Sequence, residues 1–244
     1  MSLSEVSKVF GAGPAAVPAL DRVSLGVRPG EFVCLVGASG CGKSTLLSIV
    51  AGLATASAGT VELDRGPAAL MFQDPALFPW LTVAGNVGLS LRLRRLPRAQ
   101  RQARVRELLT TVHLADFADR RPHQLSGGMR QRVALARTLG LDAPVLLMDE
   151  PFGALDAMTR DVLHDELERV WAQRNLTVLF VTHNVREAAR LGDRIILLSS
   201  RPGRVVWERD VSIPRPRRID SAAVAAVAAE VTDRLRQEVS RHGR

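Results

Sequence analysis

A glycine-rich stretch at residues 37–45, with the sequence GASGCGKST, constrains the fold of this chain more than any other feature. It fits the pattern G-x-x-x-x-G-K-[ST], follows the apolar residues 32–36 and precedes LLSIV at residues 46–50. This context predicts a buried strand, a phosphate-binding loop and a helix, in that order. The N–H groups of such a loop and the positive end of the helix dipole converge on one chain of phosphates.

This P-loop predicts a nucleoside triphosphate with Mg²⁺ as the ligand. Lys43 can reach the β- and γ-phosphates, and the hydroxyl of Ser44 can ligate the metal ion. The other candidate binding residues in the loop are Gly37, Ser39, Gly40, Gly42 and Thr45. The loop identifies a class of ligand, but it does not say what the chain does with the energy of the phosphate bond.

Length and charge narrow the class of protein. The 244 residues suffice for a full core, and no apolar run is long enough to span a bilayer. No charged-then-apolar leader follows Met1, so we expect a cytoplasmic protein. The net charge of +8 is concentrated at residues 91–106, which carry seven arginines and no acid. No aromatic side chains alternate with them, which disfavours nucleic acid and favours a solvated helix face or proximity to anionic lipid.

Strands and helices alternate in a way that predicts an α/β fold with helices on both faces of a largely parallel sheet. We expect a loop at residues 11–18, a strand at 23–27 and a helix at 129–139. The expected catalytic core and β-subdomain cover residues 1–73 and 140–210. The expected helical insertion covers residues 74–139, and a helical tail covers residues 211–244.

Polar residues follow three of the predicted buried strands. Asp149 and Glu150 end the apolar strand at 145–149, which predicts Asp149 as a Mg²⁺ ligand and Glu150 as a general base. His183 ends the next buried strand and would lie near the γ-phosphate, because sites gather at the carboxyl ends of parallel strands. Gln73 also ends a strand and could contact both Mg²⁺ and the attacking water.

A second glycine-rich helix start lies at residues 125–131, with the sequence LSGGMRQ. Ser126, Gly127 and Gly128 at a helix N-terminus form a second candidate anion site. This site has no lysine of its own. It makes physical sense if it closes on the triphosphate that a second molecule holds.

Taken together, these motifs resemble the ATPase subunit of ABC transporters. The resemblance rests on residues 37–45, Gln73, LSGGM at 125–129, the strand ending in Glu150, ALD at 154–156 and VTH at 181–183, and it covers roughly residues 3 to 210. It implies a P-loop NTPase three-layer core with an N-terminal antiparallel β-subdomain and an inserted α-helical subdomain. It also implies two copies packed head to tail, with two ATP molecules between them.

The resemblance assigns roles to single residues. Glu150 is implied as the catalytic carboxylate, His183 as the γ-phosphate switch and Gln73 as the residue that couples Mg²⁺ to a membrane partner. Asp156 is implied as a contact across the dimer. Phe10 is the candidate for the aromatic ring that stacks on adenine, at a position where the family more often has tyrosine.

Finer patterns are similar to the nitrate, sulfonate and taurine branch of bacterial importers, including FPWLTV at residues 78–83 and RPG at 201–203. Asn184 departs from the aspartate that is common after the histidine. This branch implies a separate membrane permease that contacts residues 78–91, a substrate receptor, and a peripheral place on the cytoplasmic face of the cell membrane. A soluble ATPase that acts on nucleic acid or ribosomes and an exporter ATPase are the alternatives.

Overall fold

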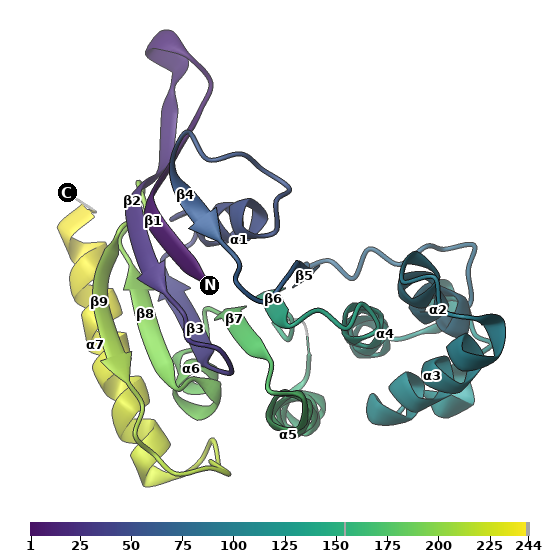
Figure 1. Ribbon diagram of the computed structural model, residues 1–244. Helices are drawn as coiled ribbons and strands as arrows, with labels where there is room; N and C mark the ends of the chain where they lie inside the picture. Colours follow the sequence, from purple (N-terminus) through teal and green to yellow (C-terminus); the bar gives the residue numbers. More distant parts are fainter. Residues whose placement is uncertain (154, 243–244) are drawn as a thin grey trace.

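A six-stranded sheet forms the centre of the molecule in the computed structural model, which describes residues 1–153 and 155–242. The strand order is β5-β6-β7-β3-β8-β9 (Figure 1). The strands are β3 (Phe32–Gly37), β5 (Ala68–Met71), β6 (Val145–Asp149), β7 (Thr177–Val181), β8 (Arg194–Leu198) and β9 (Val205–Asp210). All neighbouring pairs are parallel except β8 and β9. The expected α/β fold with a largely parallel sheet is confirmed.

The central strands are apolar throughout because both faces of the sheet are covered. Every residue of β3 and β7 is buried. Phe32 and Cys34 pack into one hydrophobic cluster and Val33 and Leu35 into the other, so alternate side chains serve opposite faces. The helix α1 (Lys43–Val50) covers one face, and α5 (Ala157–Arg174) and α6 (Val185–Leu191) pack in the cluster on the other.

A smaller antiparallel sheet contains β1 (Ser2–Phe10), β2 (Val17–Gly26) and β4 (Ala58–Glu62), in the order β2-β1-β4. Its β1–β2 hairpin projects from the body of the molecule (Figure 1). The expectation of a loop up to residue 18 and a strand from residue 23 was wrong, because β2 already begins at Val17 and pairs it with Phe10. Pro18 fits there because β2 is an edge strand.

The region between β5 and β6 is helical and lies beside the sheet (Figure 1). It contains α2 (Val83–Leu93), α3 (Arg98–Thr111) and α4 (Gly127–Leu139). The last of these starts two residues earlier than expected, because Ser126 caps it by accepting a hydrogen bond from the Met129 N–H at 3.2 Å.

Side chains of α4 fasten the segment that follows β5. Gln131 Nε2 donates to the carbonyl of Gln73 at 3.3 Å. The guanidinium of Arg137 donates to the carbonyls of Pro75 at 2.7 Å and Ala76 at 2.8 Å. Residues 73–76 are therefore attached to α4 by three hydrogen bonds from two side chains.

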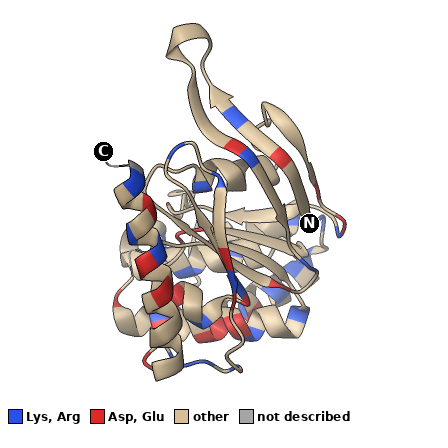
Figure 2. Cartoon of the chain, turned by 90° about the vertical axis from the view of Figure 1, so that its left-hand side faces the viewer, with Lys and Arg blue, Asp and Glu red and all other residues tan. Residues whose placement is uncertain are grey.

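The C-terminal helix α7 (Ala222–His242) lies along the sheet beside β9 and packs on α6 (Figure 1). Its buried residues Val224, Val227, Ala228 and Val231 form one apolar stripe. Figure 2 shows basic and acidic residues interleaved on the rest of α7. Within the described residues, no helix is long and apolar enough to cross a membrane.

Candidate functional site

The P-loop connects β3 to α1 in the order that its sequence predicts. Gly40 and Gly42 have φ of 76° and 103°, a left-handed region that favours glycine. A Cβ on Gly42 would lie 2.7 Å from the carbonyl oxygen of Ala19 and 2.7 Å from a methyl of Leu20. The close approach of β2 therefore requires glycine at this position, as well as the backbone conformation.

Lys43 begins α1 and turns back over the loop. Its side chain is buried, and its ammonium group donates to the carbonyls of Gly37 and Ala38 at 2.9 Å each. A cavity of about 240 Å³ opens beside it. The cavity is lined by Ala19, Ser39, Gly40, Gly42, Lys43, Ser44, Thr45, Gln73, Glu150 and Arg201. Eight of the candidate residues thus share one cavity.

Oxygen atoms that suit Mg²⁺ lie in the wall of this cavity and just behind it. Burial raises the pKa of Asp149 above its usual value, while a hydrogen bond with Ser44 and the charge of Lys43 act in the opposite direction. Ser44 and Gln73 lie on the cavity wall. The described residues contain no cluster of three or more His, Cys, Asp or Glu side chains that could hold a metal ion alone. A single carboxylate with neutral oxygens fits Mg²⁺, which retains water and takes its remaining ligands from substrate phosphates.

Three strand ends bring Gln73, Glu150 and His183 together. Glu150 Oε2 lies 2.9 Å from His183 Nδ1 and 3.5 Å from Gln73 Nε2. Glu150 has φ of 45°, which is uncommon for a residue other than glycine and which recurs at functional sites. An open carboxylate with a hydrogen-bonded imidazole beside a phosphate-binding loop can take a proton from water and orient it.

The second glycine-rich helix start lies outside this cavity. Ser126, Gly127 and Gly128 do not line it, and neither does Asp156, whose carboxylate caps α5 by accepting the Thr159 N–H at 2.9 Å. That hydrogen bond lowers the pKa of Asp156. In the expected motif ALD, Ala154 lies outside the described residues. In one chain, these groups have no contact with the P-loop cavity.

Four other candidates line no part of the cavity. Gly37 ends β3, where a Cβ would lie 2.9 Å from Cys41 Sγ, so glycine there serves packing. Asp149 lies beside Ser44, and His183 Nδ1 lies 2.9 Å from Glu150 Oε2, so each contacts a residue that lines the cavity. Phe10 is 47% exposed on the projecting hairpin, and the Lys8 ammonium lies 5.1 Å from its ring centroid. Adenine stacking on Phe10 remains a prediction.

Sequence reasoning missed Ala19 and Arg201 at the cavity wall. The turn that carries Arg201 is held beside the P-loop, because Gly203 N donates to Ala19 O at 2.9 Å and Asp21 N donates to Gly203 O at 3.0 Å. In the sequence, the RPG pattern contributed to the resemblance to the importer branch but predicted no contact with the P-loop. Its place beside the P-loop follows from β8 being next to β3, which no local pattern encodes.

Comparisons with known proteins show which proteins this chain is similar to. The ABC transporter family matches residues 20–153. The taurine import ATP-binding protein TauB of Burkholderia pseudomallei is 47% identical over 86% of this chain and 84% of that protein. The nitrate import ATP-binding protein NrtD of Synechocystis sp. is 42% identical over 88% of this chain and 83% of that protein.

A third relative and a solved structure are also similar to this chain. The aliphatic sulfonates import ATP-binding protein SsuB of Burkholderia ambifaria is 47% identical over 96% of this chain and 72% of that protein. The dimeric structure of MJ0796, a bacterial ABC transporter cassette, superposes with a TM-score of 0.80 at 35% identity, over 87% of this chain and 99% of that chain.

Proposed function

This chain belongs to the ABC transporter family, and we propose that it is the subunit that binds and hydrolyses ATP to drive an importer. The observation that carries the proposal is the contact between Glu150 and His183, 2.9 Å apart, at the mouth of the P-loop cavity. Taurine, nitrate and aliphatic sulfonates appear in the names of the relatives. We propose a small anionic or zwitterionic solute of this kind as the cargo.

In this proposal, some residues in and around the cavity bind the nucleotide and the metal ion, and others take part in hydrolysis. Lys43 and the P-loop N–H groups bind the phosphates, while Ser44, Asp149 and Gln73 would hold Mg²⁺, which neutralises charge on the β- and γ-phosphates. Glu150 takes a proton from the attacking water. His183 Nδ1 holds the carboxylate of Glu150 in place, and the other ring nitrogen is the group that would reach the γ-phosphate. Residues 1–73 and 140–210 would form the catalytic unit, and residues 74–139 the helical unit.

Arg201 supplies positive charge at the wall of the cavity, and no described residue forms a hydrogen bond or ion pair with its side chain. Arg201→Ala should weaken both ATP and ADP binding about fivefold, since one exposed charge contact contributes roughly 1 kcal/mol. Titration of the purified chain with a fluorescent nucleotide measures this. Arg204→Ala is the matched control, because Arg204 lies in the same turn but pairs with Asp21. Equal affinities for the two variants would remove Arg201 from the site.

We propose a dimer in which each nucleotide lies between two chains. The separation of Ser126, Gly127, Gly128 and Asp156 from the P-loop cavity of their own chain supports this arrangement, as does the dimeric form of the similar MJ0796 cassette. A head-to-tail pair would bring the N-terminus of α4 from one chain to the phosphates held by the other.

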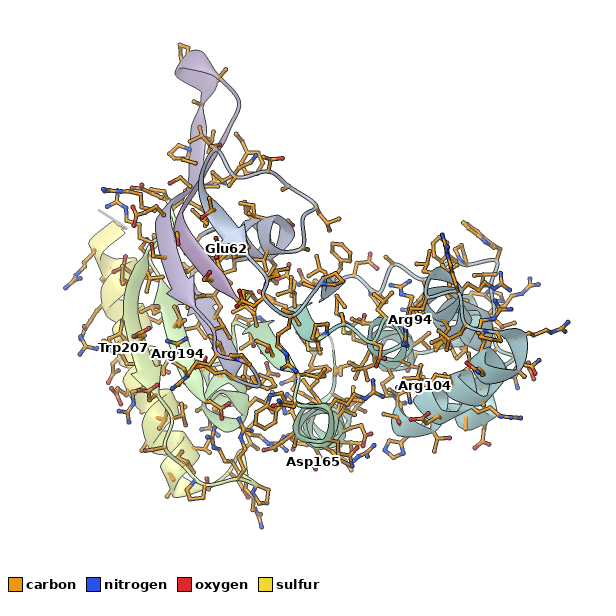
Figure 3. The ribbon with its side chains drawn as sticks, in the orientation of Figure 1. Glu62, Arg94, Arg104, Asp165, Arg194 and Trp207 are labelled. Carbon is orange, nitrogen blue, oxygen red and sulfur yellow. The ribbon has the colours of Figure 1, made fainter. Side chains whose placement is uncertain are left out.

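The permease would dock on the helical unit at the cytoplasmic face of the cell membrane. A groove of about 710 Å³ between α2 and α3 supports this docking site, because residues within the range 78–91 form part of its lining. Its lining includes the small residues Gly85 and Gly88 and four arginines, Arg92, Arg98, Arg101 and Arg106. No described residue pairs with these four side chains, whereas Arg94 and Arg104, labelled in Figure 3, pair with Asp142 and Glu107.

Reconstitution with the permease tests this function. The purified chain should hydrolyse ATP slowly, and a complex with its permease and receptor should hydrolyse it at least about tenfold faster and import the solute. Arg101→Glu should weaken permease binding but leave ATP affinity unchanged, because the groove is separate from the P-loop cavity. Arg22→Glu is the matched control, because it makes the same reversal of charge at an exposed arginine on β2. Full ATPase activity without any permease would contradict the proposal.

A further inference from the structure

A buried polar cluster lies directly behind His183, and the catalytic roles described above do not use it. Its members are His164 on α5, Thr182 before His183, and Glu187 on α6, with exposures of 0%, 2% and 3%. Arg160 on α5 borders it. Because burying charged and polar groups costs free energy that apolar side chains of similar size would not cost, the presence of this cluster calls for a reason beyond stability.

Glu187 is the centre of the cluster. Its Oε2 accepts a hydrogen bond from Thr182 Oγ1 at 2.5 Å, and its Oε1 lies 3.4 Å from His164 Nε2 and 3.5 Å from Arg160 Nε. Burial alone would raise the pKa of Glu187, but the contact with His164, the hydrogen bond from Thr182 and the charge of Arg160 lower it overall. The carboxylate therefore stays ionised and holds its partners in place.

The first branch of the cluster leads to His183. Thr182 Oγ1 donates to Glu187 and also accepts the backbone N–H of Asn184 at 2.9 Å. Asn184 is the cap of α6, where its own side chain accepts the N–H of Arg186 at 3.0 Å. The residues on both sides of His183 are thus fixed through one hydroxyl group to one buried carboxylate.

The second branch leads to the loop after Glu150. Arg160 donates to the carbonyl of Leu155 at 2.6 Å, and the His164 ring meets the Phe152 ring edge-to-face at 5.3 Å. Asp165, labelled in Figure 3, belongs to the outer rim, where it pairs with Arg190. Glu187 consequently connects, through Thr182 and Arg160, the two segments whose side chains meet in the Glu150–His183 contact.

We propose that Thr182 and Glu187 are positioning residues that hold His183 in register with Glu150, a role that rests on the proposed ATPase function. Neither residue lines the P-loop cavity. Their loss should therefore affect the rate of the chemical step and leave nucleotide binding alone. Small displacements of a catalytic group have large rate effects, because the reacting atoms must meet within a narrow range of distance and angle.

Two substitutions at one position separate positioning from packing. Thr182→Val keeps the shape and removes the hydroxyl, and we expect kcat for ATP hydrolysis by the full chain to fall about tenfold, with KM for ATP within about twofold. Thr182→Ser restores the hydroxyl and should restore kcat to within about twofold of the parent. Glu187→Gln, which keeps the volume but not the charge, should repeat the kcat loss.

Thr177→Val is the matched control, at the start of the strand β7 that Thr182 follows. Thr177 is equally buried, and its hydroxyl accepts the N–H of Gly30 at 3.1 Å at the far end of β7. It should lower the melting temperature by a similar amount to Thr182→Val and leave kcat unchanged. Equal kcat for the parent and Thr182→Val, or equal losses in the two valine variants, would overturn the proposal.

A double-mutant cycle with Glu150→Gln tests whether Thr182 acts through the Glu150–His183 contact. If it does, Thr182→Val should cause no further loss of kcat in the Glu150→Gln background. An independent tenfold loss there would overturn the positioning role. The proposed function fails separately, if the parent chain itself does not hydrolyse ATP or if Glu150→Gln has parental turnover.

Discussion

Glu150→Gln is expected to bind ATP with near-parental affinity and to hydrolyse it about 10²–10⁴-fold more slowly, the usual contribution of a general base. Glutamine keeps the length of the side chain and can still accept a hydrogen bond from His183, so the geometry at the end of β6 should persist. It cannot take a proton from water. The effect should therefore appear in kcat, with the affinity for nucleotide retained because Lys43 and the P-loop N–H groups are untouched.

Single-turnover hydrolysis of ATP, combined with a nucleotide-binding titration, measures both quantities on the same preparation. Glu208→Gln serves as the matched control, because it makes the same chemical change on an exposed side chain of β9. It should have parental kcat and affinity. Turnover of Glu150→Gln within about threefold of the parent would show that another group takes the proton.

Ser126→Arg is expected to abolish ATP-dependent dimer formation while each separate chain binds ATP normally. The long cationic side chain would occupy the space at the N-terminus of α4 where, in the proposed dimer, the phosphates of the other chain lie. Loss of the cap itself costs only about 1 kcal/mol. That cost is small beside a steric block at an interface, so the dimer should be lost well before the fold.

Light scattering with ATP, in the Glu150→Gln background that slows hydrolysis, measures the dimer directly. Ser221→Arg is the matched control, since Ser221 Oγ accepts the Val224 N–H at 3.3 Å at the start of α7 and lies on a different helix. It should dimerise like the parent. A Ser126→Arg chain that still dimerises, or that loses ATP binding as a monomer, would contradict the two-chain site.

Much of the core could be predicted because its signals are local. The apolar strands that end in Gly37, Asp149 and Val181 are buried on both faces, and polar residues follow them at the same edge of the sheet. The left-handed backbone of the P-loop at Gly40 and Gly42 is indicated by the glycines themselves. These patterns give the α/β class and bring Glu150 near His183 without any knowledge of the strand order.

The rest depends on contacts between distant segments. The strand order places β8 beside β3, and only this order brings Arg201 to the P-loop cavity. The early start of β2 depends on pairing with β1 rather than on the composition of residues 11–18. His164 and Glu187 look like ordinary helix residues in the sequence. Their place in the buried cluster depends on α5 and α6 coming together beside Thr182, which follows β7.

The three hydrogen bonds that hold residues 73–76 to α4 couple the movement of this segment to the movement of the helix. Arg137 lies ten residues from Gly127, which is about 15 Å at the rise of an α-helix. A tilt of about 10° around the helix start would move the Arg137 end by roughly 2.6 Å, more than a hydrogen bond can stretch. Any such rotation would therefore carry residues 73–76 with it and would change the distance from Gln73 to Glu150 in the same chain.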